Sequence, residues 1–176
     1  MEKIHYTITG FISTSISHEF LTWLIEQNCE KKIKKLTLFL SSTGGDVDSV
    51  LQIYSFFKAA PFPIEVIGFG NIDSASIFVM LGGTKKIATE NCRFFLDLES
   101  FMFKNPLGLL HGDKRELKMC EDRCKQQMEI FASETGKDEE VIRKTFKNGH
   151  AFSAVDAKTF GLLDEIITTF SFNTYF

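Results

Sequence analysis

The stretch Ser41–Leu81 constrains the fold of this chain more than any other. The apolar run Leu36–Ser41 is short enough to be a buried strand, and Ile64–Phe69 is a second run of the same kind. Each run is followed by a glycine-containing loop and then by an apolar helical pattern. Consecutive strand–loop–helix units are typical of a parallel sheet, whose strands end at the same edge. The sequence therefore predicts an α/β fold with both loops at one sheet edge.

These two loops carry groups that suit nucleophilic catalysis. The first contains Gly44 and Gly45, whose backbone can take positive φ and bring N–H groups close to a ligand. The second, Gly70–Asp73, is expected to turn the chain and to place the hydroxyl of Ser74 beside the N–H of Ala75. A nucleophilic serine needs such donors, because they hold the oxyanion that its attack creates. The plainer alternative is that Ser74 or Asp73 only caps a helix and that the glycines only form a turn.

Further elements are expected on both sides of this unit. The sequence predicts strands at Ile4–Thr9, Lys86–Thr89, Arg93–Phe103 and Asp164–Thr169, and helices from Ser17 to about Asn28, from about Asp113 to Thr135 and over Asp138–Lys147. Ser17 and Asp46 are the expected N-caps of the first helix and of the helix after the glycine turn. Ser153 and Asp156 resemble a capping box, and Gly136 is expected to stop the long helix.

The same loops resemble those of the proteolytic subunit of the Clp protease (caseinolytic protease) family. The matching pieces are a Ser-x-Gly-Gly turn, a Gly-x-x-x-Ser segment, a Gly-Gly helix end and an Asn-x-Arg stretch, at Ser42–Gly45, Gly70–Ser74, Gly82-Gly83 and Asn91–Arg93. The resemblance extends from about Ile4 to Ile167 and includes the closing segment Phe152–Asp164. It implies a ClpP/crotonase-like α/β fold, in which β-β-α units repeat in a spiral and one long helix protrudes.

The resemblance also implies roles for single residues. Ser74 falls on the family's nucleophile. Gly44 and Gly45, chiefly Gly45, and the N–H of Ala75 fall on the donors of its oxyanion hole. A serine peptidase subunit acting on peptide or protein substrates is therefore the activity that the family match implies.

The other two members of the family's catalytic triad are replaced. Asp97 stands where the family has its histidine base, and Gly149 stands where it has an aspartate. A carboxylate has an unperturbed pKa near ~4 and is a weaker base than imidazole at pH 7. We therefore expect a weak or inactive peptidase. His150, next to Gly149, is a substitute base only if it lies between Ser74 and Asp97.

Two alternatives to a weak peptidase remain open. In the first, the chain is a non-catalytic relative that acts as a structural or regulatory subunit of an oligomer. In the second, it is an enzyme with crotonase-like acyl-CoA chemistry. Crotonase-type enzymes share the architecture and polarise a thioester carbonyl with paired backbone N–H groups, and Asp97 or Glu99 would then transfer the proton. No residue pattern specific for coenzyme A is visible.

Length and composition limit the remaining possibilities. With 176 residues, 44% of them hydrophobic, a single domain with a substantial core is expected over residues 1–176. The net charge of −3, without a large basic cluster, gives no ground for nucleic-acid binding. No apolar run approaches the ~18 residues of a membrane span, and no apolar segment follows the N-terminal charges as in a signal peptide.

The four cysteines are expected to be small core residues in a reducing compartment, so a cytoplasmic location is predicted. Their spacing is not a common zinc pattern. No metal and no cofactor are expected.

The resemblance bears on assembly as well. The long helix, Leu117–Thr135, matches the helix that interleaves two rings of seven subunits in the family, which implies a homo-oligomer and, by family likeness, a ring. The family usually carries residues before the first strand that form axial loops and meet an ATP-driven unfoldase. Here the first strand is expected almost at Met1, so an unfoldase partnership is predicted to be absent or weakened.

Overall fold

The computed structural model describes residues 2–96 and 114–170. Its elements follow the order β1 (Glu2–Thr9), α1 (Thr14–Lys31), β2 (Ile33–Ser42), α2 (Val47–Ala59), β3 (Ile64–Asp73), α3 (Ser76–Gly82), β4 (Lys85–Thr89), β5 (Arg93–Leu96), α6 (Lys114–Thr135), α7 (Glu139–Asn148), β6 (His150–Ser153), α8 (Ala154–Phe160) and β7 (Glu165–Ile167).

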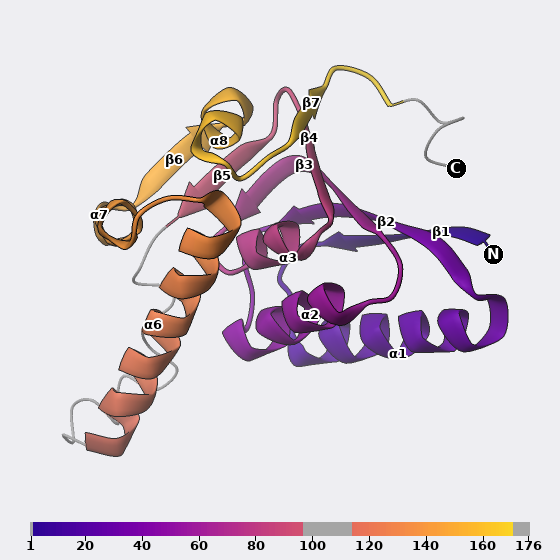
Figure 1. Cartoon of the computed structure of the whole chain (residues 1–176), viewed down its shortest axis with the longest axis horizontal. Coiled ribbons are helices and arrows are strands. Elements are labelled where there is room, and N and C mark those ends of the chain that lie inside the picture. The colour runs from indigo at the N-terminus through magenta and orange to yellow at the C-terminus, as the bar shows by residue number, and fades with distance from the viewer. Residues whose placement is uncertain (1, 97–113, 171–176) are drawn as a thin grey trace.

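The strands form one sheet of mostly parallel strands, so the predicted α/β fold is confirmed. Strands β1, β2, β3, β4 and β7 lie side by side in that order, and each neighbouring pair is parallel. The end of β3 pairs in parallel with β5, which pairs with β6 in the antiparallel sense. Helices α1, α2 and α3 lie along one side of β1–β3 (Figure 1). Both strand–helix turns of the central unit therefore lie at the carboxyl ends of neighbouring parallel strands.

The prediction of a turn at Gly70–Asp73 was wrong, because β3 continues through these residues. Gly70 has φ +66°, a conformation that glycine adopts at little cost. The strand pairs with β4 up to Gly68 and with β5 from Asn71 onward. Gly70 therefore marks a bend at which β3 changes its partner. This bend carries the end of β3, and with it Ser74, toward β5.

The helix caps agree with the sequence except at the first helix. Asp46 accepts a hydrogen bond from the Ser49 N–H at 3.0 Å, as predicted for an N-cap. The first helix begins earlier than predicted and is capped by Ser13, whose hydroxyl accepts from the backbone of the first turn. Ser17 is buried inside that helix, and its hydroxyl donates to the backbone carbonyl of Ser49 at 3.1 Å. The capping box of Ser153 is confirmed.

The largest buried cluster combines the helix-facing side of the sheet with residues of α1–α3 and α6–α8. Phe131 of α6 is fully buried and lies against the rings of Phe78, Phe146 and Phe160, with centroids 5.0–6.3 Å apart. Aromatic side chains thus join α6 to α3, α7 and α8. Within the described ranges, no helix is both long enough and apolar enough to cross a bilayer.

The cysteines divide between core and surface. Cys92 is buried, as predicted, whereas Cys29 is exposed near the end of α1, so its predicted place in the core was wrong. Its helix presents only one side to the sheet, and a cysteine on the other side stays in solvent.

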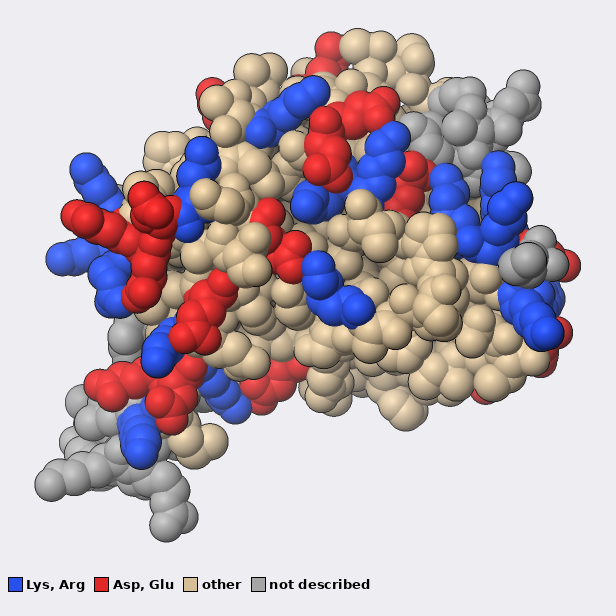
Figure 2. Space-filling view, in the orientation of Figure 1, with Lys and Arg blue, Asp and Glu red and all other residues tan. Residues whose placement is uncertain are grey.

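Polar contacts attach α6 to α2. The Arg123 guanidinium lies 3.0 Å from the Asp48 carboxylate, and the Tyr54 hydroxyl donates to Glu134 at 2.8 Å. Burial, and next the Glu134 carboxylate, raise the pKa of Tyr54. Beyond these contacts α6 extends away from the body of the molecule, as predicted for the protruding helix (Figure 1). Figure 2 shows acidic and basic side chains mixed over α6 and α7, whereas few charged side chains cover α1 and α2 on that face.

Truncating the aromatic contact of α6 should destabilise the fold strongly. We expect Phe131→Ala to lower the free energy of unfolding by about 3–5 kcal/mol, because it removes a fully buried ring and leaves a cavity. Phe11→Ala is the matched control: this side chain is 60% exposed, so its loss should change stability by about 0.5 kcal/mol or less. Urea unfolding followed by circular dichroism measures both, and equal losses would contradict this account.

Candidate functional site

The glycine turn and Ser74 meet at the carboxyl edge of β2 and β3. A Cβ atom placed on Gly44 would lie 3.1 Å from the Cβ of Ser74 and 3.5 Å from its Oγ. Gly44 has φ +108°, so a side chain there would be strained as well as crowded. The structure therefore brings together the two features that the sequence singled out, the two-glycine turn and the serine.

Ser74 has an unusual backbone. Its φ is +54°, and Lys32 is the one other non-glycine residue of the described chain with positive φ. The N–H of Ser74 donates to the carbonyl of Phe95 on β5 at 2.7 Å, which holds this conformation in place. Strained serines of this kind, between a strand and a helix, present their hydroxyl at the edge of a sheet in known hydrolases. The strain is therefore an observation in favour of a functional site.

The backbone donors near Ser74 are not equivalent. The N–H of Gly44 donates to the Ser42 hydroxyl at 3.2 Å and is thereby engaged within its own turn. In the described part of the chain, no hydrogen bond uses the N–H of Gly45 or that of Ala75. Both N–H groups are therefore without a hydrogen-bond partner among the described residues. A Cβ on Gly45 would lie 2.4 Å from the carbonyl oxygen of Ile12, so only glycine fits this position.

The β1–α1 loop holds the glycine turn from the other side. The N–H of Ile12 donates to the carbonyl of Gly44, and the N–H of Asp46 donates to the carbonyl of Ile12, both at 2.9 Å. Gly45 pairs with Ile12 as an isolated parallel bridge between these bonds. The turn is thus fixed between the β1–α1 loop and Ser74.

Ser76 belongs to this region, although the sequence analysis did not single it out. It is fully buried, and its hydroxyl lies 2.7 Å from the carbonyl oxygen of Asp73 and 3.3 Å from that of Ser42. Because a serine at the start of an apolar helix is also a common cap, its residue type alone gave no signal.

Two titratable groups of this region, one next to Ser74 in the chain and one just before β5, have raised pKa values. Burial raises the pKa of the Asp73 carboxyl, against the effect of a hydrogen bond from the Phe95 backbone. Burial also raises the pKa of Cys92 to about 12. The Cys92 thiol is therefore protonated at neutral pH and is a poor nucleophile.

The sequence-predicted partners of Ser74 are only partly described. Asp97 and Glu99 lie outside the described residues. Gly149 ends α7 with φ +60°, next to the start of β6. The four residues of β6 were not predicted as a strand, because the run is short and mixed in polarity.

His150 lies across β5 from Ser74. It pairs with Leu96, and β5 lies between β3 and β6 in the sheet. The imidazole ring packs 4.4 Å from the ring of Phe152 and lines a hollow of about 300 Å³ with Lys137 and Asp156. Its role as a substitute base stays a prediction.

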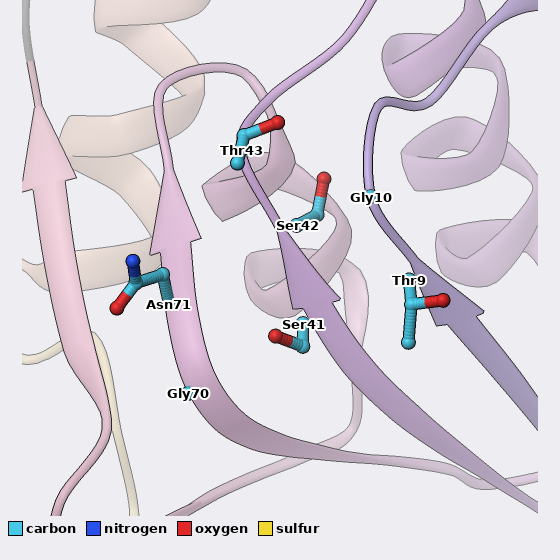
Figure 3. A pocket seen from close by; sticks show the side chains of 7 residues that line it. All are labelled: Thr9, Gly10, Ser41, Ser42, Thr43, Gly70 and Asn71. Carbon is cyan, nitrogen blue, oxygen red and sulfur yellow. The ribbon is translucent and has the colours of Figure 1, made fainter.

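A shallow hollow of about 340 Å³ opens next to the glycine turn. Figure 3 shows it between the ends of β1, β2 and β3, with Thr9, Ser41 and Asn71 around it and Gly10 and Gly70 leaving space. None of the residues that line it is charged. Among the described residues, no group of three or more His, Cys, Asp or Glu side chains is arranged to hold a metal ion.

Comparisons with known proteins bear on the family and the fold of this chain. The family model described as Clp protease matches residues 1–170. The ATP-dependent Clp protease proteolytic subunit 2 of Frankia casuarinae is 29% identical over 156 residues, which cover 87% of this chain and 70% of that protein. The subunit of the same description from Corynebacterium glutamicum is 27% identical over 161 residues, which cover 89% of this chain and 78% of that protein.

Solved structures share the fold. A mutant of ClpP1 from Listeria monocytogenes superposes with a TM-score of 0.81 at 23% identity, covering 94% of this chain and 91% of that chain. A peptidase from Plasmodium falciparum gives a TM-score of 0.82 at 20% identity, covering 94% and 96%. Since the family model spans nearly the whole chain and the fold agrees, this protein belongs to the Clp protease family.

Proposed function

We propose that this chain is a Clp-family subunit with a degenerate serine centre, in which Ser74 is the nucleophile and peptide hydrolysis is slow or absent. The observation that carries the proposal is the contact between Ser74 and the glycine turn, with the N–H groups of Gly45 and Ala75 left without partners among the described residues. Two free backbone donors beside a strained serine support this proposal, because such donors stabilise the oxyanion of acyl transfer.

The weakness of the centre follows from its missing imidazole. A serine hydroxyl reacts slowly until a base removes its proton, and general bases contribute about 10²–10⁴-fold to rates. The residue at the base position is Asp97, and the position of its orienting aspartate is Gly149. An oxyanion hole without its base retains a part of the catalysis, about 10³-fold over water in a well-studied serine protease. The proposal is therefore a slow hydrolase with peptide or protein substrates.

The proposal includes a homo-oligomer in the cytoplasm. Family members form rings, and α6 of this chain extends from the body with Met119 half-exposed, as a helix that meets other subunits would.

A fluorophosphonate probe tests the state of Ser74 directly. We expect slow labelling of the wild-type protein at one site, complete loss of labelling in Ser74→Ala, and no change in Ser55→Ala, which removes an exposed hydroxyl from α2. Intact-mass spectrometry over time measures the rate. Labelling that persists in Ser74→Ala would contradict the assignment of the nucleophile.

Placing a histidine at the base position tests whether the missing imidazole is what limits the reactivity of Ser74. Asp97→His should raise the labelling rate, by up to about 10²-fold, the lower end of what a general base supplies. Gly149 is left unchanged, because its φ of +60° disfavours a side chain. His150→Ala should leave the wild-type rate unchanged, and a rate that falls in this variant would show that His150 takes part in the proton transfer.

The partly buried carboxyl of Asp73, next to Ser74, should make stability depend on pH. Burial raises the folded-state pKa of Asp73 above its ordinary value of 3.8, so its contribution to stability is complete below that value and is lost as pH rises through the folded pKa. Asp73→Asn should therefore be more stable than wild type at pH 7, and this gain should disappear toward pH 4. Urea unfolding of both proteins between pH 4 and 8 measures the difference, and a gain independent of pH would contradict the assignment.

A further inference from the structure

We propose that Ser76 is a positioning residue that holds the glycine turn against the turn of Ser74 through its buried hydroxyl. This inference rests on the proposed function, since it assigns Ser76 to the alignment of the oxyanion donors with the nucleophile. It concerns geometry, however, and it can be tested without peptidase activity.

The sheet itself joins the two turns only weakly. Strands β2 and β3 pair regularly as far as Leu40 with Gly68, and the pairing resumes at Ser42 with Ile72. One residue of β2 thus faces three residues of β3, which is a bulge in the ladder. Ser42 with Ile72 is the last paired position of β2 and β3. Past this position, the distance between the two turns depends on contacts other than the strand ladder.

The Ser76 hydroxyl supplies that contact. It has one proton, which it donates chiefly to the Asp73 carbonyl at 2.7 Å and, in a three-centre arrangement, to the Ser42 carbonyl at 3.3 Å. Among the side-chain hydrogen bonds of the described residues, this is the one that links residues 42–45 to residues 73–76. Asp73 directly precedes the proposed nucleophile Ser74, and Ser42 lies two residues before the first glycine of the turn.

The Ser42 hydroxyl extends the connection to Gly44. It donates to the Gly44 carbonyl at 3.0 Å and accepts from the Gly44 N–H at 3.2 Å. The backbone of Gly44 is thereby tied to Ser42, and Ser42 is tied through Ser76 to the residue before Ser74. This chain of contacts sets how the N–H of Gly45 lies relative to the serine.

The hydrogen bonds of Ser76 and Ser42 are shielded from solvent, so they hold the two turns in place. Ser76 is fully buried and Ser42 is 2% exposed, so water does not compete for these hydrogen bonds. A lost buried hydrogen bond is not readily replaced, and the turns are then free to shift. Because a misplacement of about 1 Å can cost about 10²-fold in rate, a small shift of the donors is measurable.

The test uses Ser76→Ala, with Ser17→Ala as the matched control. Ser17 is also a fully buried helical serine whose hydroxyl donates to a backbone carbonyl of another element, but it lies in α1. Fluorophosphonate labelling of Ser74 should slow by at least about 10-fold in Ser76→Ala and by less than about twofold in Ser17→Ala. Both variants should show similar shifts of the urea midpoint. Ser76→Cys, which keeps a weaker donor, should label at an intermediate rate.

A second readout does not require an active serine. In the Ser74→Cys background, backbone N–H donors stabilise the thiolate, so adding Ser76→Ala should raise the pKa of the introduced thiol and slow its alkylation by iodoacetamide at pH 7. Adding Ser17→Ala should change neither. If the wild type is not labelled at all, the proposed residual activity fails while this thiol test still decides the role of Ser76. Equal labelling and equal thiol reactivity with and without the Ser76 hydroxyl would overturn the inference.

Discussion

The left-handed backbone of Ser74 is the constraint on which the rest of the site depends. A residue with a Cβ atom pays of order 1–3 kcal/mol for such a conformation unless its surroundings enforce it. Here the N–H of Ser74 is bound to β5 through Phe95 at 2.7 Å, and its carbonyl accepts from the N–H of Ile77 at 3.2 Å. Strand β3 therefore becomes α3 within two residues. The hydroxyl is left at the edge of the sheet and is not packed inside either element.

The glycine turn has its shape because it is approached from both sides. Gly44 lies against Ser74, and Gly45 lies against the backbone of Ile12, so each glycine is required by a different neighbour. The hydrogen bonds of Ile12 hold the turn to the β1–α1 loop, and the Ser76 hydroxyl holds it to α3. Three loops from neighbouring parallel strands thus meet at one place, which is the usual position of ligand sites in α/β proteins.

Local signals explain what could be predicted from the sequence. Asp46 was correctly placed as a cap, and Gly44 and Ser74 were correctly brought together, because parallel strands end at one edge. The change of strand partner at Gly70 was not predicted. A glycine after a strand usually indicates a turn, and the new partner strand, β5, is more than 20 residues further along the chain. Ser13 and Ser17 are both good caps by residue type, and only burial distinguishes them. The bridge made by Ser76 depends on a tertiary contact with Ser42, which no local pattern contains.

The positions of the backbone N–H donors are set by the fold, whereas the general base depends on the side chain at a single position. The N–H groups of Gly45 and Ala75 belong to turns whose shape is set by strand ends, so they stay in place whatever side chain stands at the base position. Their presence alone therefore does not distinguish an enzyme from an inactive relative. The hydroxyl of Ser74 does carry information, because glycine or asparagine would relieve the strain at φ +54° that serine accepts. A strained serine beside open donors is better explained by a reaction of its hydroxyl than by packing, which is why we propose a slow hydrolase and not a purely structural subunit.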